Sequence, residues 1–264
     1  MILVTGATSQ LGEVIVNKLK EKNEKIRCFV RKNSKIENLK DKDVEFSYGD
    51  FNDIKSIGKA IEGVDYIIHI GGIWYAKDFL SILDSKNIKI KKAVFVGSTS
   101  RFQKINSEDP KEIDLVKRMT AAEDFINKSK QNTIIIRPTM LYGVDKDKNI
   151  LTLIKFMDKF HIFPIIGTGE GLKQPVHVYD VADAVLKTMY NEKLIKNEYN
   201  IPGANAIEYK KIILEIKKNL ITSVLVLNIP LFMARIAFKV YKLIKPKTII
   251  NIAMINRVDR KSVV

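Results

Sequence analysis

Short apolar segments alternate along the first 140 residues with segments of helical periodicity. Strand character, rich in valine and isoleucine, recurs at Ile2–Thr5, Lys25–Val30, Val44–Phe46, Tyr66–Ile70, Ala93–Val96 and Thr133–Ile136. After the first of these, Leu11, Ile15, Val16 and Leu19 fall on one face of a helix. This alternation predicts an α/β fold with a doubly wound, parallel sheet.

The alternation loosens after Arg137-Pro138, where a smaller C-terminal α/β lobe is expected to begin. The pattern predicts helices over Asn149–Phe160, Asp180–Tyr190 and Leu231–Ile244, and strands over Val176–Val178, Glu198–Ile201 and Ser223–Asn228. We therefore predict one domain over residues 1–145 and a second, mostly separate lobe over residues 146–264, with residues 176–203 returning to the core of the first domain.

Charge is distributed unevenly along the chain. Lys and Arg outnumber Asp and Glu by 45 to 30, which gives a formal net charge of +15. No basic cluster interleaved with aromatic residues precedes residue 206, so we expect no nucleic-acid partner. From Ala206 to the end, 12 basic residues face 3 acidic ones, and such a lobe suits a small anionic substrate such as a diphosphate ester.

Cellular context and membrane contact follow from other features of the sequence. Cys28 is the one cysteine and sits in an apolar run, and the first strand starts at Ile2 without a targeting segment, so the cytoplasm is expected. The uncharged stretch 220–234 is split by Asn228 and Pro230 and is too short to span a bilayer. We expect the helix after it to pack on the lobe, with membrane-surface contact as the less favoured alternative and a homodimer left open.

The segment Thr5–Gly12, TGATSQLG, follows the first strand and opens a helix. Gly6 permits a tight turn, and Gly12 lets the helix approach the strand closely. The free N–H groups and the positive dipole end of the helix suit a pyrophosphate. This context predicts a dinucleotide-binding turn of the Rossmann type.

Four further motifs extend the comparison: Gly49-Asp50, His69–Gly72, RPTMLYG over 137–143 and QPVHVYDVADA over 174–184. With them, residues 1 to about 220 resemble the extended or atypical short-chain dehydrogenase/reductases, the NAD-dependent epimerase/dehydratase family. Ser9 stands where that family has its middle glycine. The resemblance implies a nicotinamide cofactor held by Gly6, Thr8, Ser9, Gln10, Leu11, Gly12, Arg31, Asp50, Phe51, Ile70, Gly71, Gly72, Pro138, Thr139 and Met140.

The choice between the two nicotinamide cofactors depends on the end of the second strand. A carboxylate there would bind the ribose hydroxyls of NAD and repel a 2'-phosphate. This chain has Val30-Arg31-Lys32, and a guanidinium binds phosphate in bidentate fashion. We therefore predict NADP as the cofactor, with NAD as the alternative.

The catalytic positions depart from the family pattern. Among the hydroxyls of Ser98-Thr99-Ser100, the resemblance favours Thr99 for binding the reacting oxygen, with both serines as alternatives. The family's Tyr-x-x-x-Lys pair is replaced by Leu115 and Met119, so Lys117 or Arg118 are the nearest candidates for a base. The same spacing occurs at Tyr142–Lys146 and Tyr241–Lys245, where chance explains it in so lysine-rich a chain.

Two functions follow. The first is an oxidoreductase or epimerase acting on a nucleoside-diphosphate sugar or similar anionic metabolite, with substrate contacts from Tyr142, Gln174, His177 and Arg235. The second is a non-catalytic NADP(H)-binding sensor or scaffold, which the loss of Tyr and Lys favours. No metal site is predicted.

Overall fold

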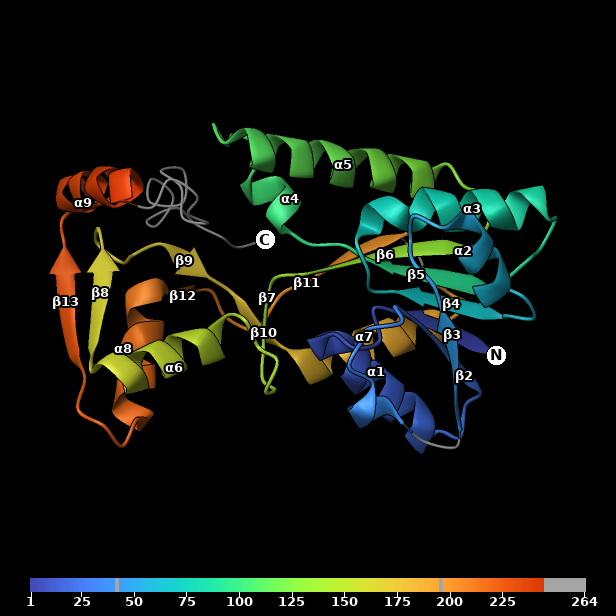
Figure 1. Ribbon diagram of the computed structural model, residues 1–264, viewed down its shortest axis with the longest axis horizontal. Helices are drawn as coiled ribbons and strands as arrows, with labels where there is room; N and C mark the ends of the chain where they lie inside the picture. The colour runs from blue at the N-terminus through green and yellow to red at the C-terminus, as the bar shows by residue number, and fades with distance from the viewer. Residues whose placement is uncertain (41–42, 195–196, 245–264) are drawn as a thin grey trace.

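A computed structural model describes residues 1–40, 43–194 and 197–244 (Figure 1). Its centre is a seven-stranded sheet in the order β11-β6-β5-β4-β1-β2-β3, and all of its neighbouring strands are parallel. The strands are β1 (Ile2–Thr5), β2 (Ile26–Val30), β3 (Val44–Tyr48), β4 (Tyr66–His69), β5 (Lys92–Val96), β6 (Thr133–Pro138) and β11 (Glu198–Ile201). The doubly wound Rossmann sheet is thus confirmed.

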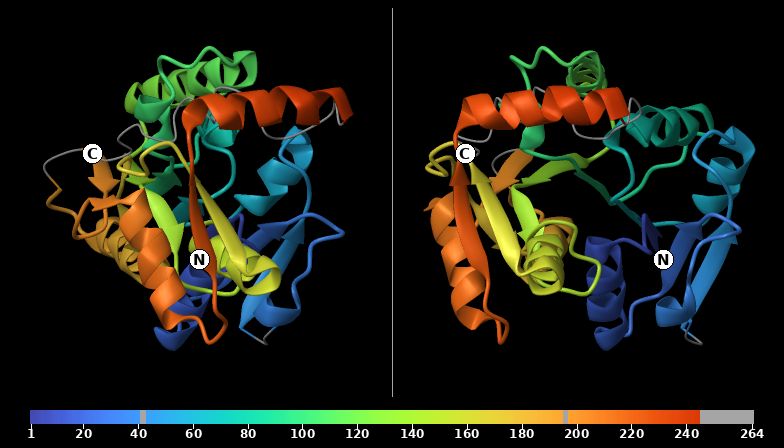
Figure 2. Two further views of the ribbon diagram at one scale, coloured as in Figure 1. Left: turned by 90° about the vertical axis from the view of Figure 1, so that its left-hand side faces the viewer. Right: turned by 60° about the vertical axis from the view of Figure 1, so that its left-hand side comes forward.

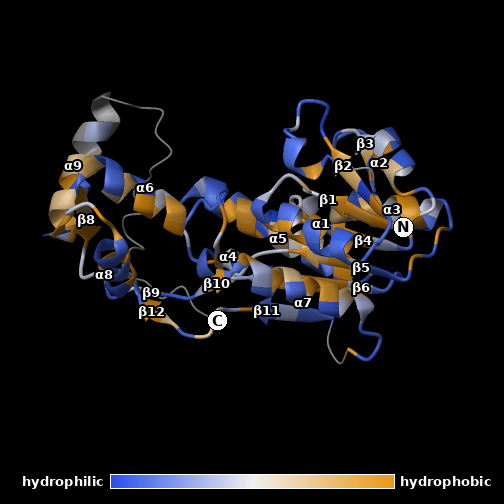
Figure 3. Cartoon of the chain, turned by 90° about the horizontal axis from the view of Figure 1, so that it is seen from below, coloured by the Kyte–Doolittle hydropathy of each residue, from blue (hydrophilic) through white to orange (hydrophobic). Residues whose placement is uncertain are grey.

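Helices cover both faces of this sheet (Figure 1). The pair α1 (Gln10–Glu21) and α7 (Val178–Tyr190) lies on one face, and α2 (Ile54–Ala60), α3 (Ala76–Ser85) and α5 (Pro110–Asn127) lie on the other. Ile2 and Val4 point to the first layer and Leu3 to the second, because successive strand residues face opposite sides. Figure 3 shows the hydrophobic residues concentrated in the strands between these layers.

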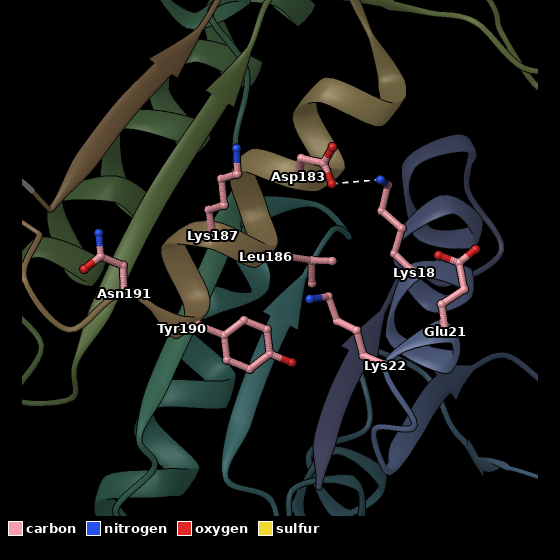
Figure 4. A pocket seen from close by; sticks show the side chains of 8 residues that line it. All are labelled: Lys18, Glu21, Lys22, Asp183, Leu186, Lys187, Tyr190 and Asn191. Atoms are coloured by element: carbon pink, nitrogen blue, oxygen red, sulfur yellow. Dashed lines mark ion pairs between the residues drawn. The ribbon is translucent and has the colours of Figure 1, made fainter.

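The helix α7 belongs to the layer of α1. Lys18 of α1 pairs with Asp183 of α7 at 2.7 Å, beside a shallow surface pocket between the two helices (Figure 4). The Tyr190 hydroxyl donates to Glu24 at 2.6 Å, and burial raises the pKa of this phenol. Of the segment 176–203, therefore, α7 and β11 pack with the first domain.

A second pair of strands links the sheet to the C-terminal part of the chain. β10 (Pro175–His177) pairs in parallel with β7 (Met140–Tyr142), outside the seven-stranded sheet. Val176 of β10 packs into the core of the first domain, although its strand does not join that sheet. The domain boundary at residue 145 stays a prediction.

The C-terminal lobe, defined as α6, β8, α8, β13 and α9, has a small core of its own. α6 (Ile150–Phe160) and α8 (Tyr209–Asn219) pack on the parallel pair β8 (Ile162–Ile166) and β13 (Leu225–Ile229). The sequence did not predict β8, which follows directly after His161 ends α6 in a left-handed conformation. A short antiparallel pair, β9 (Leu172–Lys173) and β12 (Ile207–Glu208), joins the lobe to the centre.

The remaining short elements are the 3-10 turns at Glu37–Leu39 and Ile73–Tyr75 and the helix α4 (Ser100–Gln103). The last helix, α9 (Leu231–Ile244), lies at the end of the lobe farthest from the seven-stranded sheet (Figures 1 and 2). Among the described residues, no helix has the length and apolar character needed to cross a bilayer.

Candidate functional site

A cleft of about 790 Å³ opens where the carboxyl ends of β1, β4, β5 and β6 meet. Ligands of doubly wound sheets bind at this edge. The walls come from the loops after these strands, from α5 and from the segment before α6: Thr8–Leu11, Ile70–Trp74, Val96–Ser98, Ser100, Leu115, Met119, Pro138, Thr139, Leu141, Lys146, Lys148 and Asn149.

The turn after β1 has the geometry that the sequence predicts. Gly6 adopts a left-handed conformation with φ 67°. A Cβ on Gly12 would lie 2.3 Å from the Gly6 carbonyl oxygen, so only glycine lets α1 approach the strand. Ser9 is the N-cap of α1, and its hydroxyl accepts from the Gly12 N–H at 3.1 Å. The Ser9 side chain is therefore accommodated in the turn, because it caps the helix.

The loop after β4 is held by a buried histidine. The Nδ1 atom of His69 lies 2.9 Å from the Thr5 hydroxyl and Nε2 lies 3.0 Å from the Gly72 carbonyl oxygen. A carbonyl only accepts, so Nε2 carries the proton and Thr5 donates to Nδ1. Burial lowers the pKa of His69 to about 4, which keeps the ring neutral. His69 thus positions Gly71 and Gly72 rather than binding a ligand.

Two buried donors in the cleft wall lack a hydrogen-bond partner within the described residues, Nε2 of Gln10 and Nε1 of Trp74. Trp74 packs on Gly72, and the Arg118 guanidinium lies 4.1 Å from its ring centroid. Buried polar groups are nearly always paired, so both donors indicate that an acceptor-rich ligand fills the cleft. A dinucleotide, with its phosphate, ribose and amide oxygens, fits this requirement.

The hydroxyl groups of Ser98, Thr99 and Ser100, after β5, are not arranged as the family alignment favours. Thr99 is 3% exposed, and its hydroxyl donates to the Pro138 carbonyl oxygen at 3.4 Å, so it does not line the cleft. Ser98 and Ser100 do, and the Ser98 hydroxyl donates to that of Ser100 at 2.9 Å. The structure therefore places the two serines that the sequence kept as alternatives in the cleft wall and places Thr99 outside it.

Helix α5 presents apolar side chains to the cleft. Leu115 and Met119 line it at the positions where the family has Tyr and Lys. Lys117 lies two residues from each, about 200° around the helix, and is exposed away from the cleft. Lys117 therefore does not line the cleft, and its role as the base stays a prediction, whereas Arg118 stacks on Trp74.

The arginine of the RPTMLYG motif is structural. Arg137 is buried and binds Glu123 of α5 through Nε at 3.0 Å and Nη2 at 2.7 Å, and it also pairs with Glu198 of β11. Arg101 makes a further ion pair with Glu123. This cluster fixes α5 against β6, and so sets where Leu115 and Met119 meet the cleft.

The predicted substrate residues lie outside the cleft. Tyr142 and His177 pair across β7 and β10 with their rings 5.1 Å apart, whereas Leu141, the neighbour of Tyr142, faces the cleft. Alternation along β7 thus turns Tyr142 toward a separate apolar cavity of about 690 Å³ beside α6 and α8. Met140, on the same face as Tyr142, also misses the cleft.

The other two predicted substrate residues are placed elsewhere for separate reasons. The Gln174 amide donates to the Gly203 carbonyl oxygen at 2.9 Å, and the Gln174 carbonyl accepts from the Thr139 hydroxyl. Arg235 is exposed on α9, at the far end of the lobe (Figure 1). The structure therefore gives neither residue a place in the cleft wall.

The predicted adenosine contacts cluster at the carboxyl ends of β2 and β3. Arg31 is exposed directly after β2. Asp50 accepts from the Asn52 backbone N–H at 2.9 Å. Phe51 stacks on Tyr75 with ring centroids 4.7 Å apart and packs against Gly71. None of the three predicted residues lines the cleft, and their contacts to adenosine stay predictions.

Sequence reasoning missed the basic segment before α6. Lys146 and Lys148 line the cleft, and Nζ of Lys146 donates to the Thr8 carbonyl oxygen at 3.1 Å and pairs with Glu13. The one signal in the sequence was the spacing of Tyr142 and Lys146, which chance also explains. Lys245 of the second such match lies outside the described residues.

Nucleophilic and metal chemistry have little support in the described part of the chain. Burial raises the pKa of the Cys28 thiol to about 12, so its reactive thiolate is scarce. No group of three or more His, Cys, Asp or Glu side chains among the described residues is arranged to hold a metal ion.

Comparisons with known proteins agree with this geometry. Sterol demethylase protein B of Methylococcus capsulatus is 37% identical over 101 residues, which are 38% of this chain and 29% of that protein. The ceramide reductase of Caulobacter vibrioides is 22% identical over 187 residues, or 69% of this chain and 58% of that protein. The chain thus spans less than two thirds of either relative.

A solved structure shows the same fold. The NAD complex of UDP-glucose 4-epimerase from Thermus thermophilus superposes with a TM-score of 0.69 over 87% of this chain and 86% of that chain, at 15% identity. A family model described as NAD(P)H-binding matches residues 6–192, from the glycine turn through α7. The chain therefore belongs to the NAD(P)H-binding family.

Proposed function

We propose that this chain is an NADP(H)-dependent oxidoreductase whose cofactor lies along the cleft. The observation that carries the proposal is the continuity of the cleft from the Thr8–Leu11 turn to Ser98 and Ser100, with the unpaired donors of Gln10 and Trp74 in its wall. Bound nicotinamide would supply the hydride chemistry. The protein would orient the substrate and exclude water, and the serine hydroxyls would bind the substrate oxygen.

The preference for NADP rests on Arg31. Its exposed guanidinium follows β2, where a carboxylate would select NAD. A charge-assisted pair with a 2'-phosphate contributes about 1.5 to 3 kcal/mol, or roughly ten- to a hundredfold in affinity. Arg31→Ala is therefore expected to weaken NADPH binding by about that factor and to leave NADH binding unchanged.

The substrate class has two candidates. The basic chain beyond residue 206 predicts a nucleoside-diphosphate sugar, processed by an oxidoreductase or epimerase. The reacting end of the cleft is walled by Ile73, Trp74, Leu115 and Met119, which offer few partners to sugar hydroxyls. This wall favours a carbonyl or alcohol substrate with an apolar body, and we propose that class first.

A second candidate function is cofactor binding without turnover. Leu115 and Met119 line the cleft where the family's Tyr and Lys act. General acid-base assistance is typically worth about 10²- to 10⁴-fold in rate, so its loss suits a sensor or scaffold.

Calorimetry with NADPH and NADH, followed by absorbance at the reduced nicotinamide band, separates these functions. The absorbance screen uses apolar ketones, aldehydes and alcohols alongside nucleotide sugars. Binding with turnover that Ser100→Ala reduces and Lys117→Met spares supports the oxidoreductase. Binding without turnover on any class supports the sensor, and the absence of heat with both coenzymes refutes both functions.

A further inference from the structure

The helix α9 exposes a broad apolar face. Phe232, Met233 and Ile236 are 62%, 51% and 59% exposed, whereas Ala234 is buried. At 100° per residue, the three exposed positions fall within about 100° of arc on the side away from Ala234. The helix thus buries its Ala234 side and exposes this apolar face.

The bare side of the β8–β13 pair adds to that face. Leu225 and Leu227 are exposed, and Ile162, paired with Leu225, is exposed beside them. The residues between them, Phe163 and Val226, pack toward α6 and α8. Strand alternation thus places these exposed side chains together on one side of the small sheet, and α9 follows β13 directly (Figures 1 and 2). We call these six exposed apolar residues of α9, β8 and β13 the outer apolar surface.

Positive charge borders the outer apolar surface. Residues 231–244 contain no Asp or Glu, and Arg235 is exposed on α9. The sequence has Lys239 and Lys242 four and seven positions after Arg235, although their side chains lie outside the described part of the structure. An apolar helix face beside the exposed Arg235, on a helix whose sequence lacks acidic residues, complements the headgroups and acyl boundary of anionic lipid.

We propose that the outer apolar surface binds the surface of an anionic lipid bilayer, with α9 lying in the plane of the interface. The mode is peripheral, because no helix among the described residues is long and apolar enough to cross. Patches of exposed apolar side chains mark interaction sites, and the excess of positive charge on α9 selects anionic lipid as the partner. None of the residues that line the Rossmann cleft belongs to the outer apolar surface, so lipid binding would leave the cleft lining free.

Vesicle co-sedimentation with the full chain tests this assignment. Vesicles of phosphatidylcholine with phosphatidylglycerol are expected to bind the protein at low salt at least about tenfold more tightly than vesicles of phosphatidylcholine alone. Replacing Phe232 and Ile236 by serine, or Arg235 by glutamate, is expected to weaken binding by about tenfold.

Matched controls come from α2, on the Rossmann domain. Ile54 is 63% exposed, like Phe232, and Lys55 beside it is an exposed cation, so Ile54→Ser and Lys55→Glu are expected to leave vesicle binding unchanged. Circular dichroism and NADPH titration check that every variant is folded. No binding to either vesicle, or equal losses in the α2 controls, overturns the proposal. The proposal is also overturned if the protein does not bind lipid and instead forms a dimer that Phe232→Ser dissociates, since a second copy would then cover the surface.

Discussion

Lys146 crosses from the segment before α6 to the dinucleotide turn and neutralises Glu13. Its ammonium donates to the Thr8 carbonyl oxygen at 3.1 Å and pairs with the Glu13 carboxylate in the first turn of α1. That turn is also where the pyrophosphate is expected to meet free N–H groups. Without Lys146, the Glu13 charge would repel the cofactor, so Lys146→Met is expected to weaken NADPH binding.

The magnitude follows from the geometry of the first turn. For a carboxylate and a phosphate separated by about one turn of helix and a side chain, roughly 7 Å, an effective dielectric constant of about 20 would give roughly 2.4 kcal/mol of repulsion. The Lys146 side chain is 37% exposed, so solvent screening reduces this value. We expect a net loss of about 1 to 2 kcal/mol, or roughly five- to thirtyfold in Kd.

A double-mutant cycle distinguishes this role from a simple tie between the lobe and α1. If Lys146 acts by neutralising Glu13, the single variant Glu13→Gln should bind NADPH more tightly than the wild type. The Kd of the double variant, Lys146→Met with Glu13→Gln, should then lie within about twofold of the wild-type value. Lys18→Met removes the ion pair with Asp183 on the same helix and serves as the control. A double variant as weak as Lys146→Met alone would refute the electrostatic argument.

Two further predictions concern stability. The folded pKa of His69, about 4, lies below its unfolded value of 6.5, so the unfolded chain binds the extra proton and stability is lost as pH falls from about 6.5 to 4, by about 3 kcal/mol in total. The free energy of unfolding, measured in urea across this pH range, should fall with pH in the wild type by that amount. An equal pH dependence in His69→Gln would contradict the prediction. Gly12→Ala should destabilise the protein and weaken NADPH binding more than tenfold, because its Cβ meets the Gly6 carbonyl oxygen at 2.3 Å. Gly58→Ala in α2, whose nearest neighbour is the flexible Lys86 ammonium at 3.5 Å, should be tolerated, and equal thermal melts for the two variants would count against this steric account.

The sheet and the cofactor turn could be predicted because their signals are local. Strand periodicity and the spacing of Gly6 and Gly12 depend on residues within a few positions of one another. Right-handed crossovers restrict the possible strand orders, and the structure supplies the order itself. The turn geometry then depends on backbone contacts that only glycine permits.

Side-chain direction at the site was harder to predict, because it depends on single backbone angles. Thr99 adopts helical φ and ψ of −66° and −11° at the start of α4, and this turns its hydroxyl to Pro138 while Ser98 and Ser100 face the cleft. Leu141 and Tyr142 are likewise neighbours on β7, so they face opposite sides of the strand. An error of one position in the predicted register would exchange the two. The contact of Lys146 with Thr8 spans 138 residues, and no local pattern reports it.

The serine pair also bears on how a reduction would obtain its proton. The Ser98 hydroxyl donates to Ser100 at 2.9 Å, so the proton of Ser100 is the one available to a substrate oxygen. Leu115 and Met119 cover the side from which the family's Tyr would act, and their apolar surface admits little water. Ser100→Ala should therefore lower kcat more than Ser98→Ala, which removes only the second member of the relay. Equal losses would mean that both hydroxyls bind the substrate oxygen directly, and an unchanged kcat in both variants would refute proton supply by the serine pair.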